Sequence, residues 1–146
     1  MAELPLDLTG AIATAIDGAD VSGHPLALGY VDDAGHAALS YRGSVYVYSP
    51  WQLALWSRSA DGGLVAAIAR RPQVSLLYYA RETPGPRYLS IGGRARVVRS
   101  VDERVYATMP QHERERDPDA AGVAVIVDVD RVLGFDETGR FTMARA

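Results

Sequence analysis

The stretch WQLALWSRSADGGLVAAIARRP, from Trp51 to Pro72, begins with a strand-like apolar segment, breaks at serine and glycine residues, and then carries apolar residues at helical spacing. It predicts a strand over 52–58, a loop, and a short helix that ends at Pro72. Such a junction can hold a phosphate at the helix N-terminus, with arginine and serine around it. It can equally be a turn between two core elements, and the stretch alone leaves both interpretations open.

The rest of the chain is dominated by strand patterns. The turn sequence DDAG separates two alternating segments, so residues 25–42 predict a β-hairpin. Besides the helix of the first stretch, helical spacing is confined to 7–17 and 100–110. Further strands are expected at 44–48, 73–80, 88–98 and 123–135.

These elements predict a mainly β (α+β) protein, a six-stranded antiparallel barrel that is closed or half-closed and has short flanking helices. No segment repeats and no linker divides the chain, so residues 1–146 are expected to form a single domain, with 1–20 as an N-terminal helix region. Strands 44–48 and 74–79 carry apolar or aromatic residues on both faces. Because a barrel buries one face of a strand, a second copy is expected to cover the other, which predicts a homodimer.

The composition excludes several classes of function and site. The net charge of −3 argues against a nucleic-acid partner, and no apolar stretch is long enough to span a membrane. The absence of cysteine excludes disulfides, zinc–thiolate sites and thiol catalysis. The acidic start, MAELPLDLTG, has no signal-peptide pattern, so a cytoplasmic location is expected. All 15 basic residues are arginine, so an anion site must use guanidinium groups, hydroxyls or backbone N–H groups.

No self-sufficient catalytic motif is present. The sequence has no G-x-S-x-G elbow, no phosphate loop ending in GK[ST], and no G-x-G-x-x-G after a strand. His24, His36 and His112 have no second ligand at metal-like spacing, so no metal site is expected. The tract QHERERDPDAAG, 111–122, is expected to be a solvated loop. An enzyme with this sequence would therefore depend on a cofactor for its reactive atoms.

The loop after strand 52–58 could present backbone N–H groups to an anion. Asp61 is placed to cap the following helix. Gly62 and Gly63 would leave the N–H groups of the first helical turn unobstructed.

Two arginines could complete that site. Strand alternation puts Trp56 and Arg58 on one face of their strand, and Ser40 and Arg42 on one face of an earlier strand. These side chains could bind a phosphate while Trp56 or a tyrosine borders a flat ring. The competing interpretation places Trp56 in the core and Arg58 in solvent, and leaves the glycines only a turn to form.

Four successive segments resemble the pyridoxamine 5′-phosphate oxidase-like flavin-binding split barrels. They are YRG, LALWSRSADGGLVAAIARRPQVSLLYY, RYLSIGGRARVV and GVAVIVDVDRVLGF, and the resemblance extends from about residue 24 to 135. It implies a Greek-key split barrel, a homodimer, and FMN bound in a groove between the subunits. It also implies a role in cofactor binding for Arg42, Ser57, Arg58, Ser59, Gly62, Gly63 and Leu64.

Two departures from the family pattern stand out. The family often has a lysine eight residues before the proline that ends the helix, and this chain has Leu64 there. The chain also lacks the arginine- and proline-containing C-terminal segment with which true pyridoxamine phosphate oxidases hold their substrate, so that activity is not expected.

The sequence therefore leads to the hypothesis of an FMN-binding oxidoreductase that transfers hydride through the flavin, with its substrate unknown. The segments RYLSIGGRA and VIVDVDRVLG are also similar to a branch of this superfamily that uses the 8-hydroxy-5-deazaflavin coenzyme (coenzyme F-420), whose phosphate and acidic tail would suit an arginine-rich groove. A non-catalytic flavin carrier or sensor, or a family member that has lost its site, are further alternatives. Tyr41, Tyr79 and His36 are candidates for a proton donor, and none is singled out.

Overall fold

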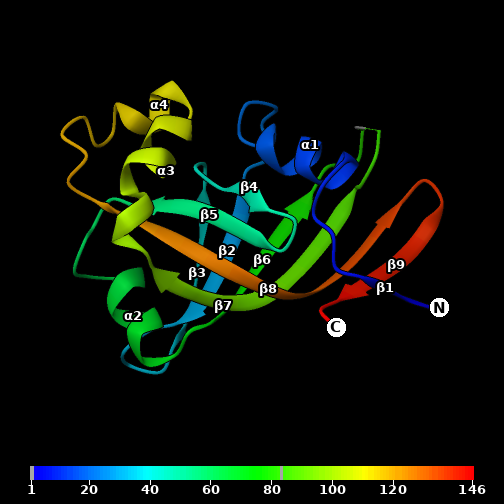
Figure 1. Ribbon diagram of the computed structural model, residues 1–146, viewed down its shortest axis with the longest axis horizontal. Coiled ribbons are helices and arrows are strands. Elements are labelled where there is room, and N and C mark those ends of the chain that lie inside the picture. Colours follow the sequence, from blue (N-terminus) through cyan, green and yellow to red (C-terminus); the bar gives the residue numbers. More distant parts are fainter. Residues whose placement is uncertain (1, 83) are drawn as a thin grey trace.

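The protein is built around a single nine-stranded sheet, in a computed structural model that describes residues 2–82 and 84–146 (Figure 1). The main path of the sheet runs β1-β9-β8-β7-β6-β2-β3, and β5 pairs with both β4 and β8. All strand pairs are antiparallel except β1 with β9. The strands are β1 (Glu3–Pro5), β2 (Leu26–Val31), β3 (Ala37–Arg42), β4 (Tyr46–Ser49), β5 (Gln52–Ser57), β6 (Gln73–Tyr79), β7 (Tyr88–Val97), β8 (Val123–Asp136) and β9 (Gly139–Ala144).

Strand β8 joins the two parts of this sheet. Its first half pairs with β5, its second half pairs with β9, and β7 runs beside both halves. The register shifts where Gly92 faces Arg131 but Gly93 faces Val129, so that no residue of β7 lies opposite Asp130 in the strand register. Such a bulge bends a strand and increases its twist. The bend lets one strand serve two differently directed neighbours.

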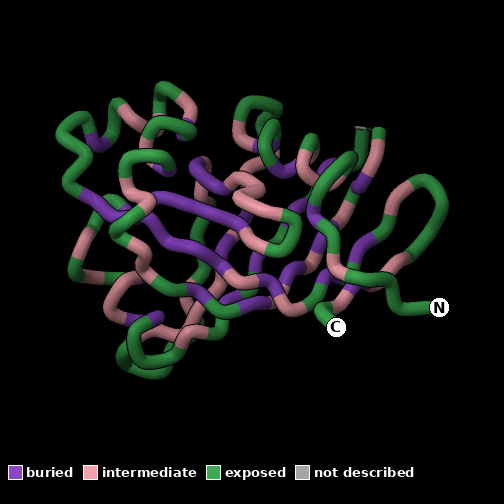
Figure 2. Tube along the Cα trace, in the orientation of Figure 1, coloured by how far each residue is buried: buried purple, intermediate pink, exposed green. Residues whose placement is uncertain are grey.

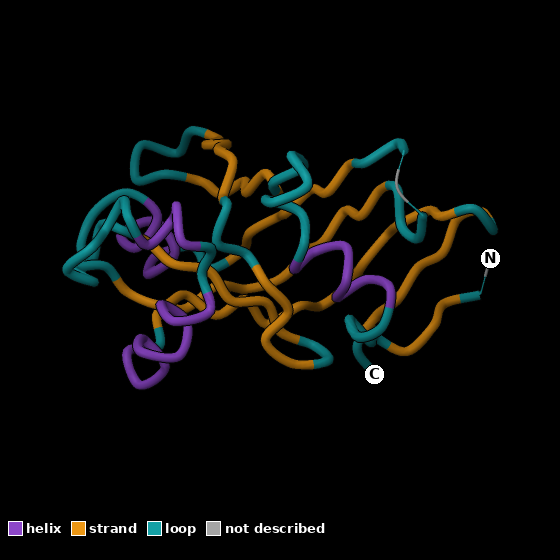
Figure 3. Tube along the Cα trace, turned by 90° about the horizontal axis from the view of Figure 1, so that it is seen from above, coloured by secondary structure: helices purple, strands orange, loops and turns teal. Residues whose placement is uncertain are grey.

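Helices cover the ends and edges of the sheet. Helix α2 contacts β2 and β7, whereas α3 contacts β5 and β8. Both lie with α4 at one end of the sheet, and the β1–β9 pair lies at the other (Figures 1 and 3). No helix in the described ranges is long and apolar enough to cross a membrane. The helices are α1 (Ala11–Asp17), α2 (Leu64–Arg70), the 3₁₀ helix η1 (Arg99–Val101), α3 (Asp102–Thr108) and α4 (Gln111–Arg114).

Two apolar clusters form the core. The larger one fills the concave side of the sheet and includes Leu53 and Leu55 of β5. The smaller one lies between β5, β8 and α3, and contains Ala54, Trp56, Val105, Met109, Ala124 and Ile126. Strand β5 is therefore buried on both faces, as is the first part of β8 (Figure 2).

The structure confirms the mainly β class, the 25–42 hairpin and the strand–loop–helix order of 51–72. It has nine strands rather than the six of the expected barrel: the seven strand segments expected from the sequence are all present, and β1 and β9 extend the sheet beyond 123–135. Strand β9 follows β8 through the turn Glu137–Thr138, and its mixed sequence GRFTMA has weak strand alternation. The helix expected at 7–17 begins only at Ala11.

The bulge gives a direct test of the sheet. A Cβ atom at Gly93 would lie 2.5 Å from the carbonyl oxygen of Asp128 and 3.0 Å from Cγ1 of Val127. Gly93→Ala is therefore expected to lower the free energy of unfolding by about 1–3 kcal/mol, the usual cost of overpacking. Gly29→Ala is the matched control, because a Cβ there meets its nearest atoms at 3.8 Å. Urea unfolding curves that show equal stability for the two variants would contradict this account of the bulge.

Candidate anion-binding site

Three guanidinium groups line one cavity of about 230 Å³, which we call the arginine pocket. The cavity lies where β3 ends, where the turn to β4 begins, and where β5 runs into the loop before α2. The segment after α3 closes its remaining side. The lining residues are Ser40, Tyr41, Arg42, Gly43, Ser44, Trp56, Arg58, Glu113 and Arg116.

Arg42 is the most enclosed of the three cations. Its Nε donates a hydrogen bond to Oγ of Ser40 at 3.1 Å. Burial lowers the pKa of Arg42 below its ordinary value, the like charge of Arg58 acts in the same direction, and Tyr30 and Glu113 oppose both. A bound anion would reduce the electrostatic repulsion between the neighbouring guanidinium groups of Arg42 and Arg58.

The structure brings Arg42, Trp56 and Arg58 together as the sequence suggested. It does not bring the remaining predicted site residues to the same cavity. Those residues lie at the end of β5, in the following loop and at the start of α2, outside the lining of the arginine pocket; they are Ser57, Ser59, Gly62, Gly63 and Leu64.

The hydroxyl groups of that loop bond within the loop itself. Ser57 is buried and its Oγ donates to the carbonyl oxygen of Ser59 at 2.9 Å. The Oγ of Ser59 in turn accepts a hydrogen bond from the N–H of Gly62 at 3.1 Å. Leu64 begins helix α2 and is buried in the core. The expected cap at Asp61 is wrong, since the N-cap residue is Gly63, with φ +52° and no side-chain cap.

Trp56 forms part of the pocket wall from inside the protein. It is only 4% exposed, and its ring meets the ring of Tyr106 edge-on at 5.2 Å between centroids. Its Nε1 donates to Oδ2 of Asp117 at 2.9 Å. Helix α3 covers the face of β5 from which Trp56 projects, so the indole has a fixed orientation.

Sequence reasoning missed Glu113 and Arg116, because it assigned 111–122 to a solvated loop. That tract contains helix α4 and the buried Asp117, so its end is anchored to the protein. The only local signal was the turn-forming sequence DPDAAG after the charged residues. The contact of this tract with β5 is made by residues that are distant in the sequence, so it produces no periodic pattern in the tract itself.

An acidic cluster borders the arginine pocket. Nε2 of His112 lies 2.7 Å from Oδ2 of Asp20 and 3.9 Å from Oε1 of Glu113. Carboxylate oxygens of Asp20 and Glu113 also pack against Gly43, where a side chain would collide with both. Metal-like spacing could not suggest this grouping, because Asp20 and His112 are far apart in sequence. The cluster fixes the position of Glu113 at the edge of the pocket.

A second cavity adjoins the arginine pocket through Tyr41. It has a volume of about 410 Å³, and we call it the aromatic cavity. Its lining is Gly23, His24, Pro25, Ala27, Tyr41, Leu77 and Tyr79. The two cavities together offer cations on one side of Tyr41 and apolar and phenolic surface on the other.

The convex face of the sheet carries large exposed apolar side chains, which we call the outer-face patch. Ala27 of β2 lies opposite both Leu77 and Tyr41 in the strand register, and Ser90 of β7 lies opposite both Leu77 and Leu133. Because residues opposite one another in a sheet point to the same side, Leu77, Tyr41 and Leu133 share one face. The patch consists of Leu39, Tyr41, Leu77, Tyr79, Leu133 and Phe135, each at least 36% exposed.

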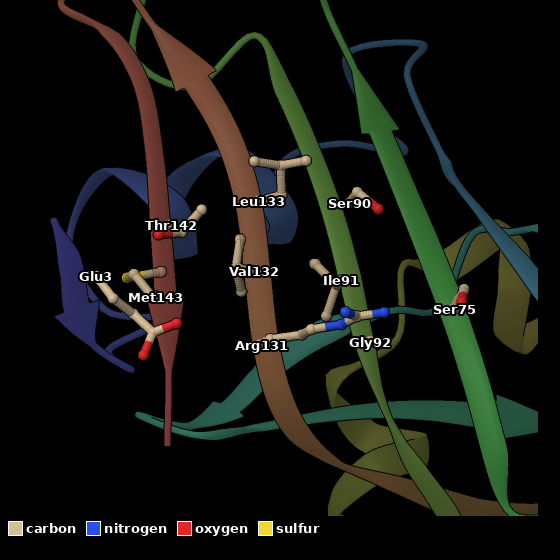
Figure 4. A pocket seen from close by; sticks show the side chains of 10 residues that line it. All are labelled: Glu3, Ser75, Ser90, Ile91, Gly92, Arg131, Val132, Leu133, Thr142 and Met143. Carbon is tan, nitrogen blue, oxygen red and sulfur yellow. The ribbon is translucent and has the colours of Figure 1, made fainter. Parts of the chain in front are cut away.

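A shallow depression of about 360 Å³ crosses this face beside the patch (Figure 4). Figure 4 shows the Arg131 side chain lying across β7 at Gly92, toward Ser75. A Cβ on Gly92 would come within 3.3 Å of Nε of Arg131, so glycine leaves the room that this side chain uses. In the part of the chain that the structure describes, no carboxylate lies within 4.0 Å of the Arg131 guanidinium group.

The hydrogen bonds of Asp117 predict that the stability of the protein depends on pH in acid. Burial by itself would raise the pKa of Asp117, but hydrogen bonds from Trp56, Ala121 and Gly122 and the charge of Arg58 together lower it. Its contribution to stability is therefore fully present above about pH 4 and is lost as the pH falls further. Asp117→Asn should lower the free energy of unfolding by about 1–3 kcal/mol at pH 7. The difference from wild type should shrink in urea titrations as the pH falls below about 4, and a constant difference would contradict this assignment.

Neither a protein-family model nor a curated protein matches this sequence. Solved structures do match. HupZ of Group A Streptococcus is 14% identical with a TM-score of 0.64, and the match covers 91% of this chain and 97% of that one. A Clostridium acetobutylicum protein related to general stress protein 26, of the pyridoxinephosphate oxidase family, is 10% identical with a TM-score of 0.62, covering 93% and 96%.

The general stress protein 26 of Bacillus anthracis is 17% identical with a TM-score of 0.60, and the match covers 86% of this chain and 91% of that one. At these identities the likeness concerns the fold. It agrees with the resemblance that the four sequence segments carried. The chain therefore has the fold of the pyridoxamine 5′-phosphate oxidase-like split barrels.

Proposed function

We propose that the arginine pocket binds the phosphate of FMN and that the protein is an FMN-dependent oxidoreductase. The observation that carries this proposal is the convergence of Arg42, Arg58 and Arg116 on one cavity. Guanidinium groups recognise phosphate through paired, charge-assisted hydrogen bonds. The fold supports the choice of ligand, because its neighbours include a protein named as a member of the pyridoxinephosphate oxidase family.

The charges of the pocket fit a phosphate monoester. Three guanidinium groups and the carboxylate of Glu113 leave an excess of positive charge, and a phosphate monoester carries about −1.5 to −2 near neutral pH. Leu64 stands where the family often has a lysine, and it is buried. Arg116 supplies a cation from a different part of the chain. The missing lysine therefore does not leave the pocket without a third cation.

The aromatic cavity is the proposed place for the flavin ring. Tyr41 and Tyr79 are 76% and 51% exposed, so their rings are available to border a flat ligand. The flavin, when bound, supplies the hydride acceptor and donor that the chain itself lacks. Tyr41 and Tyr79 stay candidates for a proton donor because both line this cavity. His36 lies in the turn at the far end of the β2–β3 hairpin, where its N–H donates to Asp32.

The proposal includes a homodimer that uses the outer-face patch. Six large apolar side chains on one face exceed the scattered exposure that is normal on a monomer. A second copy packed on this face would also enclose the aromatic cavity, which shares Tyr41, Leu77 and Tyr79 with the patch. A two-fold interface of this kind places the same surface on both partners.

The phosphate assignment can be tested with flavins that differ only in that group. Arg58→Ala and Arg116→Ala should each weaken FMN binding by roughly ten- to a hundredfold, the expected cost of a lost charged hydrogen bond. Binding of riboflavin, which lacks the phosphate, should change little. Flavin fluorescence titration gives both affinities, and Arg99→Ala is the control because Arg99 is exposed and paired with Asp102.

Equal FMN affinity in wild type and Arg58→Ala would refute the phosphate assignment. A wild-type protein that binds the 8-hydroxy-5-deazaflavin coenzyme but not FMN would keep the anion site and change the cofactor. Tight FMN binding without turnover by any nicotinamide donor would indicate a carrier or sensor. The present observations favour neither alternative.

The dimer can be tested separately. Leu77→Arg places a charge in the middle of the outer-face patch and should convert a dimer to a monomer, because an unpaired charge is costly to bury. Val21→Arg is the control, since Val21 is 81% exposed and lies outside the patch. Sedimentation velocity measures the oligomeric state of both variants. A wild-type protein that sediments as a monomer at tens of micromolar would exclude a dimer of useful affinity.

A further inference from the structure

We infer that Asp117 is a positioning residue that fastens the segment after α3 to the end of β5, so that Arg58 and Arg116 face the same anion. Its effect on ligand affinity rests on the proposed function of the arginine pocket. Asp117 itself does not line that pocket, so it acts on the ligand only through its neighbours.

The Asp117 carboxylate joins two distant parts of the chain. Its Oδ2 accepts hydrogen bonds from Nε1 of Trp56 and the N–H of Gly122, both at 2.9 Å. Its Oδ1 accepts one from the N–H of Ala121 at 3.0 Å. The side chain is 7% exposed, so water offers these donors little replacement. One carboxylate therefore ties a strand side chain to two backbone groups of the loop.

The tie lies directly beside the cations. Arg116 precedes Asp117 in the chain, and Arg58 is the second residue after Trp56. Gly122 packs against the Ser57 carbonyl oxygen and against Cα of Arg58, so closely that no side chain could be accommodated there. The carboxylate thus fixes both arginines through their immediate neighbours.

The backbone of the loop after Asp117 has an unfavourable conformation that contacts within the loop must stabilise. Ala120 has φ +50°, and it is the only non-glycine residue in the described ranges with a positive φ. A residue with a side chain adopts this conformation at a cost, which its surroundings must offset. The N–H of Ala120 donates to the carbonyl oxygen of Asp117 at 3.0 Å, and the hydroxyl of Tyr106 donates to the same oxygen at 2.8 Å.

The test combines amide hydrogen exchange with FMN titration. In Asp117→Asn an NH2 donor replaces one of the two carboxylate oxygens, so the amide of either Ala121 or Gly122 loses its acceptor and should exchange faster while the β7–β8 amides keep their rates. FMN affinity should fall by about tenfold, as expected for one weakened charged contact. Trp56→Phe keeps the aromatic packing on Tyr106 but removes one donor, and should give a smaller change in the same direction.

Two controls separate positioning from general destabilisation. Gly134→Ala is expected to be destabilised by a similar amount, because a Cβ there would lie 2.8 Å from the carbonyl oxygen of Tyr88 in the part of β8 that pairs with β9, and it should keep wild-type FMN affinity. In an Arg116→Ala background, Asp117→Asn should cost less affinity than it does in wild type, because part of what it positions is already gone.

Two kinds of result would contradict the inference. Unchanged exchange at Ala121 and Gly122 in Asp117→Asn would show that the carboxylate does not hold the segment. Faster exchange with unchanged FMN affinity, or an equal loss of affinity in the Arg116→Ala background, would show that it does not position the cations. If wild type bound no FMN, the proposed function would fail, and the exchange measurements would still decide whether Asp117 fixes the segment.

Discussion

The close contact between β7 and β8 at Gly93 is the constraint on which the rest of the fold depends. With no side chain at this position, the strands approach closely enough for a bulge, and β8 bends there. The bend directs the first half of β8 along β5 and the second half along β9. Because β5 stays paired with β8 as far as Ser57, the chain leaves the sheet at a defined point and places Arg58 beside the end of β3. The position of the arginine pocket therefore follows from the geometry of a strand pair that contains none of its arginines.

Local sequence patterns predicted those parts of the protein that depend on neighbouring residues. The 25–42 hairpin and the 51–72 junction are determined by alternation and turn residues, and both are present. Alternation also put Trp56 of β5 and Arg58, which follows that strand, on one side of the chain, and both line the arginine pocket with Arg42. It could not reveal that α3 covers this face and buries the tryptophan, since that depends on packing between separate elements.

The parts that sequence reasoning missed depend on contacts between distant segments. The tract 111–122 is rich in charge and resembles a solvated loop, but a single buried carboxylate connects it to Trp56. Strand β9 has little apolar alternation because much of its surface is exposed. The charge pattern of β7 shows the same limit: Arg94 and Arg96 are exposed, and each is paired with an aspartate of β8. Nothing on one strand indicates which residues its neighbour will present.

The use of arginine alone at the pocket has a consequence for ligand recognition. A guanidinium group keeps its proton at every pH at which a protein is ordinarily folded, whereas a lysine in a crowded cationic site can lose its charge. The positive charge contributed by Arg42, Arg58 and Arg116 is therefore constant across the physiological range. A phosphate monoester, by contrast, gains its second negative charge near about pH 6. If the arginine pocket binds a phosphate monoester as proposed, the ionisation of the ligand, and not that of the protein, would set how strongly the cations attract it.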